Sequence, residues 1–156
     1  MWNILENKIP TGTYLKKRAF LGPTWCVLCL QEEETTQHLF LSCPTTRNIW
    51  TQVLQTLNLN MSWQGIDIIT AWDSWWGTTT MKNTRNLPLL VSWHIWLNRN
   101  IKIFEDKPVN WNLLPPKICA AFEELPNDEC QKRPRHIRQE HINTTIPWAY
   151  FDGAAQ

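Results

Sequence analysis

The segment that decides the fold spans residues 26–43 and has the sequence CVLCLQEEETTQHLFLSC. Cys26, Cys29, His38 and Cys43 occur in it with the spacing C-x2-C-x8-H-x4-C. Three cysteines and one histidine are a common ligand set for a tetrahedral structural Zn²⁺, and a two-residue gap lets both thiolates of a tight turn point at one ion. Four protein ligands leave no open position for a reacting molecule. The spacing therefore predicts one structural zinc ion and not a hydrolytic centre.

The second pair of ligands requires a break in the backbone between them. Positions five apart on a continuous helix differ by roughly 140°, at about 100° per residue, so His38 and Cys43 on one helix would not face the same ion. Pro44 resolves this, because the residue before a proline is pushed out of the helical region. We therefore expect a short helix around His38, a break before Cys43, and a second helix that starts at Pro44 with the Cys43 thiolate at its N-cap.

Two other interpretations of this cluster are open. The cysteines could be buried free thiols beside a surface histidine, or a cysteine and His38 could form a catalytic dyad. The dyad is the poorer of the two, because a third cysteine close to a C-x2-C pair is typical of metal binding. The chain has five cysteines, an odd number that disfavours a complete disulfide framework. Two of them, Cys119 and Cys130, lie outside the cluster with no predicted partner.

The composition bounds the remaining function classes. The 156 residues include 15 Lys and Arg and 14 Asp and Glu, a formal net charge of +1, which excludes a protein whose whole surface is basic and binds nucleic acid. No apolar run approaches the length of a membrane span, and the first ten residues lack the apolar core of a secretory signal. We expect no membrane partner, no small-molecule substrate and a reducing intracellular compartment, nucleus or cytoplasm, between which no signal chooses.

Hydrophobic periodicity predicts a mainly α-helical fold: a small zinc-stabilised helical domain, a helical extension and a strand at the C-terminus. Apolar residues at helical spacing favour helices over residues 44–57, 67–76, 89–105 and 116–125. Gly77 and the threonine run that follows it are expected to end the second of these helices.

Apolar stripes on two of the predicted helices indicate which side chains form the core. The stripe on the first helix comprises Ile49, Trp50, Val53, Leu54 and Leu57. The stripe on the third comprises Leu89, Trp93, Trp96, Leu97, Ile101 and Phe104. We therefore expect Trp50, Trp93 and Trp96 in the core and not on a base-stacking surface, whereas Trp25, beside the first zinc ligand, is a candidate for an exposed ring.

Motifs on both sides of the cluster occur in the order found in a known family. They are Ile9-Pro10-Thr11-Gly12 with Leu15 and Arg18, then Glu34-Thr35-Thr36-Gln37-His38-Leu39-Phe40, Cys43-Pro44, Trp50, and Trp93-x2-Trp96-x2-Arg99-Asn100 with Phe104. Together they resemble the zinc-binding domain that follows reverse transcriptase in plant non-LTR (LINE-type) retrotransposon polyproteins. The last motif, Phe151-Asp152-Gly153-Ala154, resembles the first strand of an RNase H-like domain, in which the aspartate is a metal position.

The chain departs from this family pattern in two respects. The family often has glycine after the second cysteine, where Leu30 stands here; if that position needs a positive φ, leucine costs on the order of 1 kcal/mol. On this resemblance we expect the reverse transcriptase palm to be absent and the RNase H-like domain to be cut after one strand, so that Asp152 would lack the other carboxylates that hold catalytic metal ions. The resemblance therefore implies a fragment of a polyprotein that is not an enzyme as it stands.

The predicted division of the chain has four parts. Residues 1–60 form the reverse transcriptase zinc-binding domain, 61–128 the helical extension, 129–147 a linker, and 148–156 the truncated first strand of the RNase H-like domain. If zinc binds, the first part is expected to need it for folding, because structural zinc contributes about 10–16 kcal/mol whereas a whole domain has about 5–15 kcal/mol of net stability.

Three functional hypotheses follow. In the first, which the resemblance favours, the partner is element RNA or target DNA, and Lys16, Lys17 and Arg18 contact phosphates from a position that the zinc site fixes. In the second, which the near-neutral charge favours, the zinc domain is a structural module that docks the polymerase against RNase H. In the third, the chain is a decayed fragment without function.

Other polar residues receive simpler interpretations. Residues 32–34, three consecutive glutamates, are expected in a solvated loop between the ligand pairs. His94 is expected to be packed or hydrogen-bonded and not a ligand. The densest basic run is expected to be a solvated linker, with phosphate contact as the alternative; it consists of Lys132, Arg133, Arg135 and Arg138.

Overall fold

A computed structural model of the chain describes residues 2–22, 24–79 and 82–125. The predicted linker, the C-terminal strand with Asp152, Cys130 and the basic run from Lys132 to Arg138 lie outside these residues. The elements in chain order are α1 (Trp2–Leu5), α2 (Gly12–Lys17), the π-helical turn η1 (His38–Ser42), α3 (Pro44–Thr56), α4 (Ile68–Thr78), α5 (Lys82–Arg85), α6 (Leu87–Phe104), the 3₁₀ turn η2 (Trp111–Leu113) and α7 (Leu114–Glu123).

The mainly α-helical prediction is confirmed. The four predicted helices are α3, α4, α6 and α7, each displaced by at most two residues at either end. Over the part of the chain that the structure describes there is no β-strand, only an isolated antiparallel bridge between Trp25 and Glu33. Within the same part, no helix has the length and apolar character needed to cross a membrane.

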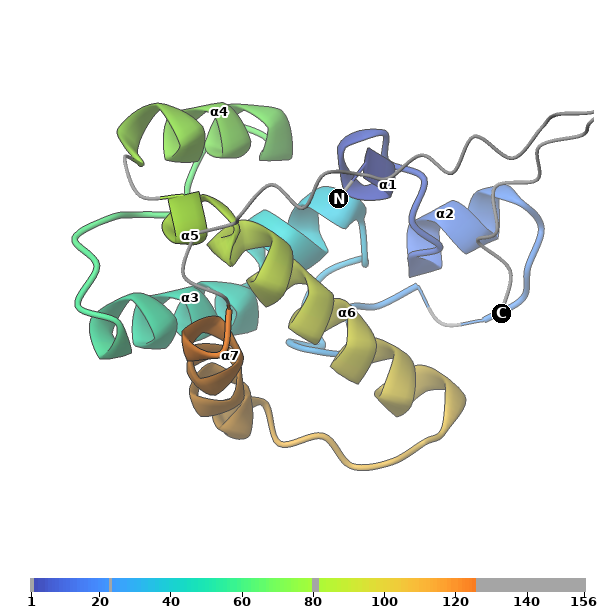
Figure 1. Ribbon diagram of the computed structural model, residues 1–156. Helices are drawn as coiled ribbons and strands as arrows, with labels where there is room; N and C mark the ends of the chain where they lie inside the picture. The colour runs from blue at the N-terminus through green and yellow to red at the C-terminus, as the bar shows by residue number, and fades with distance from the viewer. Residues whose placement is uncertain (1, 23, 80–81, 126–156) are drawn as a thin grey trace, which may run out of the picture.

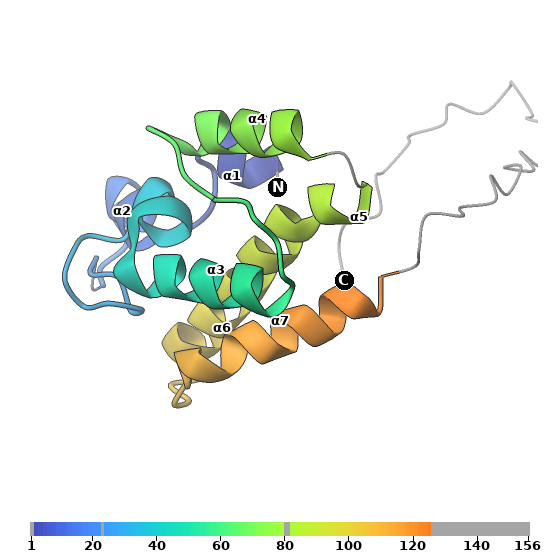
Figure 2. The same ribbon diagram turned by 90° about the vertical axis from the view of Figure 1, so that its left-hand side faces the viewer.

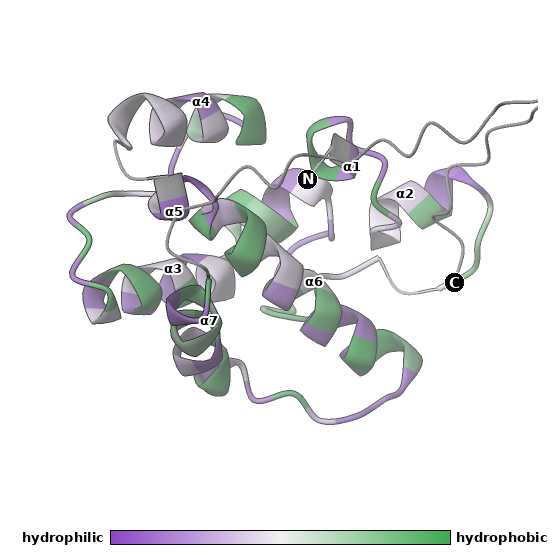
Figure 3. Ribbon diagram, in the orientation of Figure 1, coloured by the Kyte–Doolittle hydropathy of each residue, from purple (hydrophilic) through white to green (hydrophobic). Residues whose placement is uncertain are grey.

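The core of the molecule lies around α3. The stripe predicted on this helix is buried from Ile49 to Leu54, and Leu57 is partly buried. Helix α7 packs against both α3 and α6, while α4 lies on the opposite side of α3 from α7 (Figures 1 and 2). Apolar and polar residues alternate around α3 and α6 (Figure 3), which is the pattern expected of helices that bury one face.

Helix α4 begins with a capping box. The Asp67 carboxylate accepts a hydrogen bond from the Thr70 backbone N–H at 2.7 Å, and the Thr70 hydroxyl bonds back to Asp67. Gly65 is required just before it, because a Cβ there would lie 2.6 Å from the Ala71 nitrogen. The predicted end at Gly77 and the threonine run is confirmed: α4 ends at Thr78, whose hydroxyl bonds to the Ser74 carbonyl.

Tryptophans from α3, α4 and the connection between them form one aromatic cluster. Trp50 and Trp63 are stacked with ring centroids 5.1 Å apart, and Trp75 lies within 6.2 Å of both. The indole N–H groups of the buried rings are satisfied, since Trp63 donates to the Phe40 carbonyl and Trp75 to the Thr84 carbonyl, each at 3.0 Å. Such pairs add about 0.5–1.5 kcal/mol beyond their area burial. The expectation that Trp50 belongs to the core is confirmed.

Most of the stripe predicted on α6 faces solvent. The buried face of this helix is instead Leu87, Val91, Ile95 and Arg99. Trp93 is 58% exposed, so its assignment to the core is wrong; Trp96 is only partly buried. Leu89, Leu97 and Phe104 are exposed as well. The physical reason is that α6 has two apolar faces, and periodicity alone does not say which of them meets α7 and the zinc segment.

Candidate metal centre

The first two ligands lie on one tight turn. The backbone N–H of Cys26 donates to the Glu32 carbonyl, and that of Leu30 donates to the Cys26 carbonyl, both at 2.8 Å. These bonds fold the segment so that the side chains of Cys26 and Cys29 can turn to the same side. Leu30 closes the turn with φ at 57°, so the residue after the second cysteine does need the conformation that favours glycine. The condition under which leucine is unfavourable at this position is therefore met.

The second two ligands lie on either side of a helix break. His38 opens the turn η1, and Cys43 has φ −57° and ψ 128°, outside the helical region. Its N–H bonds to the His38 carbonyl at 2.8 Å, and α3 starts at Pro44 with Cys43 as its N-cap residue. The predicted short helix, the break before Cys43 and the new start at Pro44 are all confirmed.

The four ligand atoms converge on one point. They all lie within 4.8 Å of one another, with Cys26 Sγ 3.9 Å from Cys43 Sγ and Cys29 Sγ 3.2 Å from His38 Nε2. Tetrahedral zinc with bonds of about 2.3 Å to sulfur separates two thiolates by about 3.8 Å, so the sulfur spacing fits zinc. Cys26, His38 and Cys43 are buried and Cys29 is partly buried. These residues could therefore hold one zinc ion as a structural crosslink.

Cys43 is the ligand whose thiolate the fold favours most. The hydrogen bond from the Cys26 thiol is the largest cause that lowers the pKa of Cys43 to about 5, and the same bond raises the pKa of Cys26. The backbone N–H groups of Thr46 and Thr45 at the start of α3 act in the same direction on Cys43, while burial opposes them. They make no cap hydrogen bond to the sulfur, so the predicted capping of α3 by the Cys43 thiolate is wrong, and we attribute their effect to the field of the helix start.

Glu32 fixes the orientation of the histidine ligand. One oxygen of its carboxylate lies 3.0 Å from His38 Nδ1, on the ring nitrogen that does not face the sulfur atoms. A carboxylate in this position holds the ring and its tautomer for coordination through Nε2. This role was not predicted, because three adjacent glutamates carry no signal of which one turns inward.

Glu34 is the largest departure from the predicted solvated loop. Glu34 and Arg99 of α6 are each 1% exposed. The Arg99 guanidinium donates to both carboxylate oxygens of Glu34, with Nε 3.1 Å from each. The Gly12 N–H donates to the same carboxylate at 2.9 Å, and the Arg99 guanidinium lies over the Trp96 ring, 4.8 Å from its centroid. The loop interpretation is thus wrong for Glu34, although Glu32 and Glu33 are exposed.

The basic residues proposed for phosphate contact lie on α2. Lys16 and Lys17 are exposed in its last turn, and Arg18 follows as its C-cap residue. The helix is attached to the zinc segment, because Thr13 donates from both its N–H and its hydroxyl to the Glu34 carbonyl, at 3.2 and 2.9 Å. The zinc segment therefore positions α2, as predicted.

The remaining candidates have structural roles. His94 bonds through Nδ1 to the Leu90 carbonyl at 2.9 Å, as expected of a hydrogen-bonded histidine. Cys119 is buried, and burial raises the pKa of its thiol.

The described residues contain one cluster that could hold a metal ion, formed by Cys26, Cys29, His38 and Cys43. Trp25 is exposed.

The fold and the site define a small helical protein built around a Cys₃His zinc centre. Residues 1–50 match the family model described as zinc-binding in reverse transcriptase. The matched segment contains all four ligands and ends within α3. No curated protein and no solved structure matches the chain. The match supports a reverse transcriptase zinc-binding domain, which is an accessory domain and not a catalytic one.

Proposed function

We propose that this chain is a zinc-stabilised accessory module of a reverse transcriptase polyprotein and that it assists nucleic-acid binding through α2. Lys16, Lys17 and Arg18 contact phosphates of element RNA or target DNA in this proposal. The order of the sequence motifs supports a LINE-type retrotransposon of plant origin as the source.

The observation that carries this proposal is a hollow of about 520 Å³ beside α2. Its walls combine two ammonium groups with hydroxyl and amide groups, which are the groups that contact phosphate oxygens. The lining residues are Asn7, Thr11, Thr13, Tyr14, Lys16, Lys17, Glu33 and Thr35. Arg18 stands just outside it, with its guanidinium 4.8 Å from the centroid of the Tyr14 ring.

One carboxylate lies in this hollow and already has a partner. Lys16 Nζ is 3.5 Å from Glu33 Oε1, and both side chains are more than half exposed. An ion pair of this kind contributes at most about 1 kcal/mol, so a phosphate can displace Glu33 from Lys16 at little cost.

Salt-dependent binding of single-stranded RNA tests the proposal. Three phosphate contacts predict a slope of log K against log salt near −2, and the triple change Lys16→Ala, Lys17→Ala, Arg18→Ala should remove that slope and most of the affinity at low salt. The matched control is Lys102→Ala, Lys107→Ala, Lys117→Ala, which removes the same charge elsewhere, from two exposed positions and the half-buried Lys102. No binding by the unchanged protein, or equal loss in the control, would contradict the proposal.

One observation favours the second hypothesis, a docking module. The face of α6 that carries Leu89, Trp93 and Leu97 is apolar and exposed. Beside it lies a hollow of about 220 Å³ between α6 and the N-terminal segment, to which Ile4, Ile9 and Pro10 contribute. If this face docks another domain of the polyprotein, Trp93→Glu should abolish that association and leave RNA binding intact. If the chain is instead a decayed fragment without function, neither RNA binding nor docking should be detected.

A further inference from the structure

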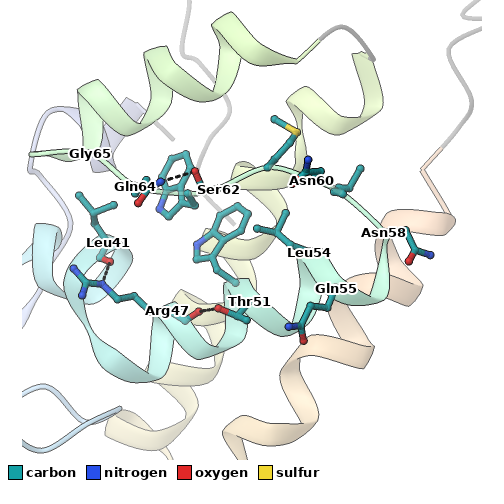
Figure 4. Close-up of a pocket in the computed structure, with 14 residues that line it drawn as sticks. Leu41, Arg47, Thr51, Leu54, Gln55, Asn58, Asn60, Ser62, Gln64 and Gly65 are labelled. Atoms are coloured by element: carbon teal, nitrogen blue, oxygen red, sulfur yellow. Dashed lines mark hydrogen bonds between the residues drawn. The ribbon is translucent and has the colours of Figure 1, made fainter.

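A second surface of the molecule lies far along the chain from the α2 hollow. It is an open groove of about 810 Å³ between α3 and the connection of residues 57–66, shown in Figure 4. Its floor is apolar and fixed, since it contains the stacked pair of Trp50 and Trp63 and the side chain of Leu54. Its volume falls in the range of small-ligand sites.

The rim of the groove is made of amide side chains. Gln55 comes from α3, and Asn58, Asn60 and Gln64 come from the connection (Figure 4). Gln64 bonds to Ser62 within the groove, whereas the side chains of Gln55, Asn58 and Asn60 make no hydrogen bond to any residue that the structure describes. Each of these amides offers both donors and an acceptor to a ligand.

Arg47 is the single ionisable residue that lines the groove. Its Nε donates to the Leu41 carbonyl at 3.4 Å, which holds the guanidinium at one end of the groove with its terminal nitrogens free of hydrogen bonds to the described residues. No Asp or Glu occurs anywhere between Glu34 and Asp67. The groove therefore has a positive end and no carboxylate that would repel an anion.

We propose that this groove binds single-stranded polynucleotide, with the amides of Gln55 and Asn60 on base edges and Arg47 on a phosphate. Asn and Gln side chains pair with base edges through matched donors and acceptors. Bases expose their Watson–Crick edges and their faces only when they are unpaired, which favours a single strand over a duplex. An acidic peptide could also bind Arg47, but it has no base edges to pair with the donors and acceptors of the Gln55 and Asn60 amides.

This inference rests on the proposed function, because it names a second contact surface for the same class of partner. The two surfaces differ in chemistry: α2 supplies charge, whereas the groove supplies recognition of bases. A ligand that has a sugar–phosphate backbone but no bases should therefore distinguish the α2 surface from the groove.

The experiment compares a 12-nucleotide single strand of mixed sequence with an abasic oligomer of the same length, in RNA and DNA forms that distinguish the two sugars. We expect the unchanged protein to prefer the base-bearing strand. Changing both Gln55→Ala and Asn60→Ala should weaken that strand at least tenfold, remove the preference and leave the salt slope unchanged, because both substitutions are neutral. Asn48→Ala, an exposed amide of α3 outside the groove, is the matched control and should change nothing.

The outcomes separate the two proposals. If the base preference survives in the groove variant while the α2 variant loses affinity, the inference is overturned and the proposed function stands. If the unchanged protein binds neither oligomer, both fail. Binding of an acidic peptide without any oligonucleotide binding would assign the groove to a protein partner and would overturn the inference as well.

Discussion

At the scale of single residues, Leu30 is the position where the chain departs from an otherwise favourable local structure. It is 74% exposed, so its side chain contributes little burial, and its φ of 57° is unfavourable for a residue with a Cβ atom. The turn tolerates the strain because Cys26 and Cys29, on which it is built, are held by the other ligands. Leucine at this position weakens the turn without preventing it from forming.

Leu30→Gly should raise the free energy of unfolding of the zinc-loaded protein by about 1 kcal/mol, because glycine adopts positive φ without steric cost. Urea unfolding followed by tryptophan fluorescence measures this difference. Leu97→Gly is the control: Leu97 is an exposed leucine inside α6, where glycine should lower stability by about 0.5–1 kcal/mol. Destabilisation by both changes would show that Leu30 is not strained.

Glu32 is the second residue whose effect can be isolated. Glu32→Ala removes the carboxylate that holds His38 Nδ1, and losses of this type lower metal affinity about 10–100-fold. Competition with a chromophoric chelator measures the zinc affinity of each variant. Glu33→Ala is the matched control, since Glu33 bonds to Lys16 and not to a ligand. An equal effect of the two changes would assign the loss to general charge and not to orientation of His38.

At the scale of elements, the ion pair between Glu34 and Arg99 decides how α6 is oriented. The two residues are 65 positions apart, and their pair joins the zinc segment, the start of α2 and the middle of α6 at one buried point. Arg99 sits on the same helix face as Val91 and Ile95, so burying this pair turns Trp93 and Leu97 outward. The apolar face that results is the surface named above for docking.

Arg99→Met should lower the free energy of unfolding by about 3–5 kcal/mol, because it leaves the Glu34 carboxylate buried without its charge partner. The double change Glu34→Gln and Arg99→Met should cost less than Arg99→Met alone, since it removes the stranded charge. Denaturant unfolding of both single variants and the double variant gives the coupling energy of the pair. Strictly additive losses would mean that the two side chains act independently.

At the scale of the whole molecule, contacts cross the predicted boundary at residue 60. Arg99 binds Glu34, α7 packs on α3, and Trp63 and Trp75 pack on Trp50. The matched family segment ends at residue 50, inside the helix at the centre of these contacts. The structure therefore couples the zinc site to helices that follow it by more than 40 residues.

Removing zinc should consequently unfold more than the ligand segment. The far-UV circular dichroism should lose helical signal from α6 and α7 together with α3 when a chelator is added, and native mass spectrometry should find one zinc per chain before it. Changing both Cys26→Ala and Cys43→Ala should abolish zinc binding, whereas Cys119→Ala, which removes a buried thiol outside the cluster, should retain it. Zinc retained without Cys26 and Cys43, or helicity indifferent to the chelator, would refute the coupling.

The sequence by itself determined the features that depend on neighbouring residues. Pro44 sets the break before Cys43 and apolar spacing sets the extents of the helices, because each is a local constraint on backbone or periodicity. Only the tertiary structure decided which face of α6 is buried, that Glu34 is an interior charge while Glu32 serves His38, and that Trp93 faces solvent. Those outcomes depend on partners such as Arg99, 65 residues from Glu34, and no local pattern specifies which of two apolar faces or three adjacent carboxylates such a partner selects.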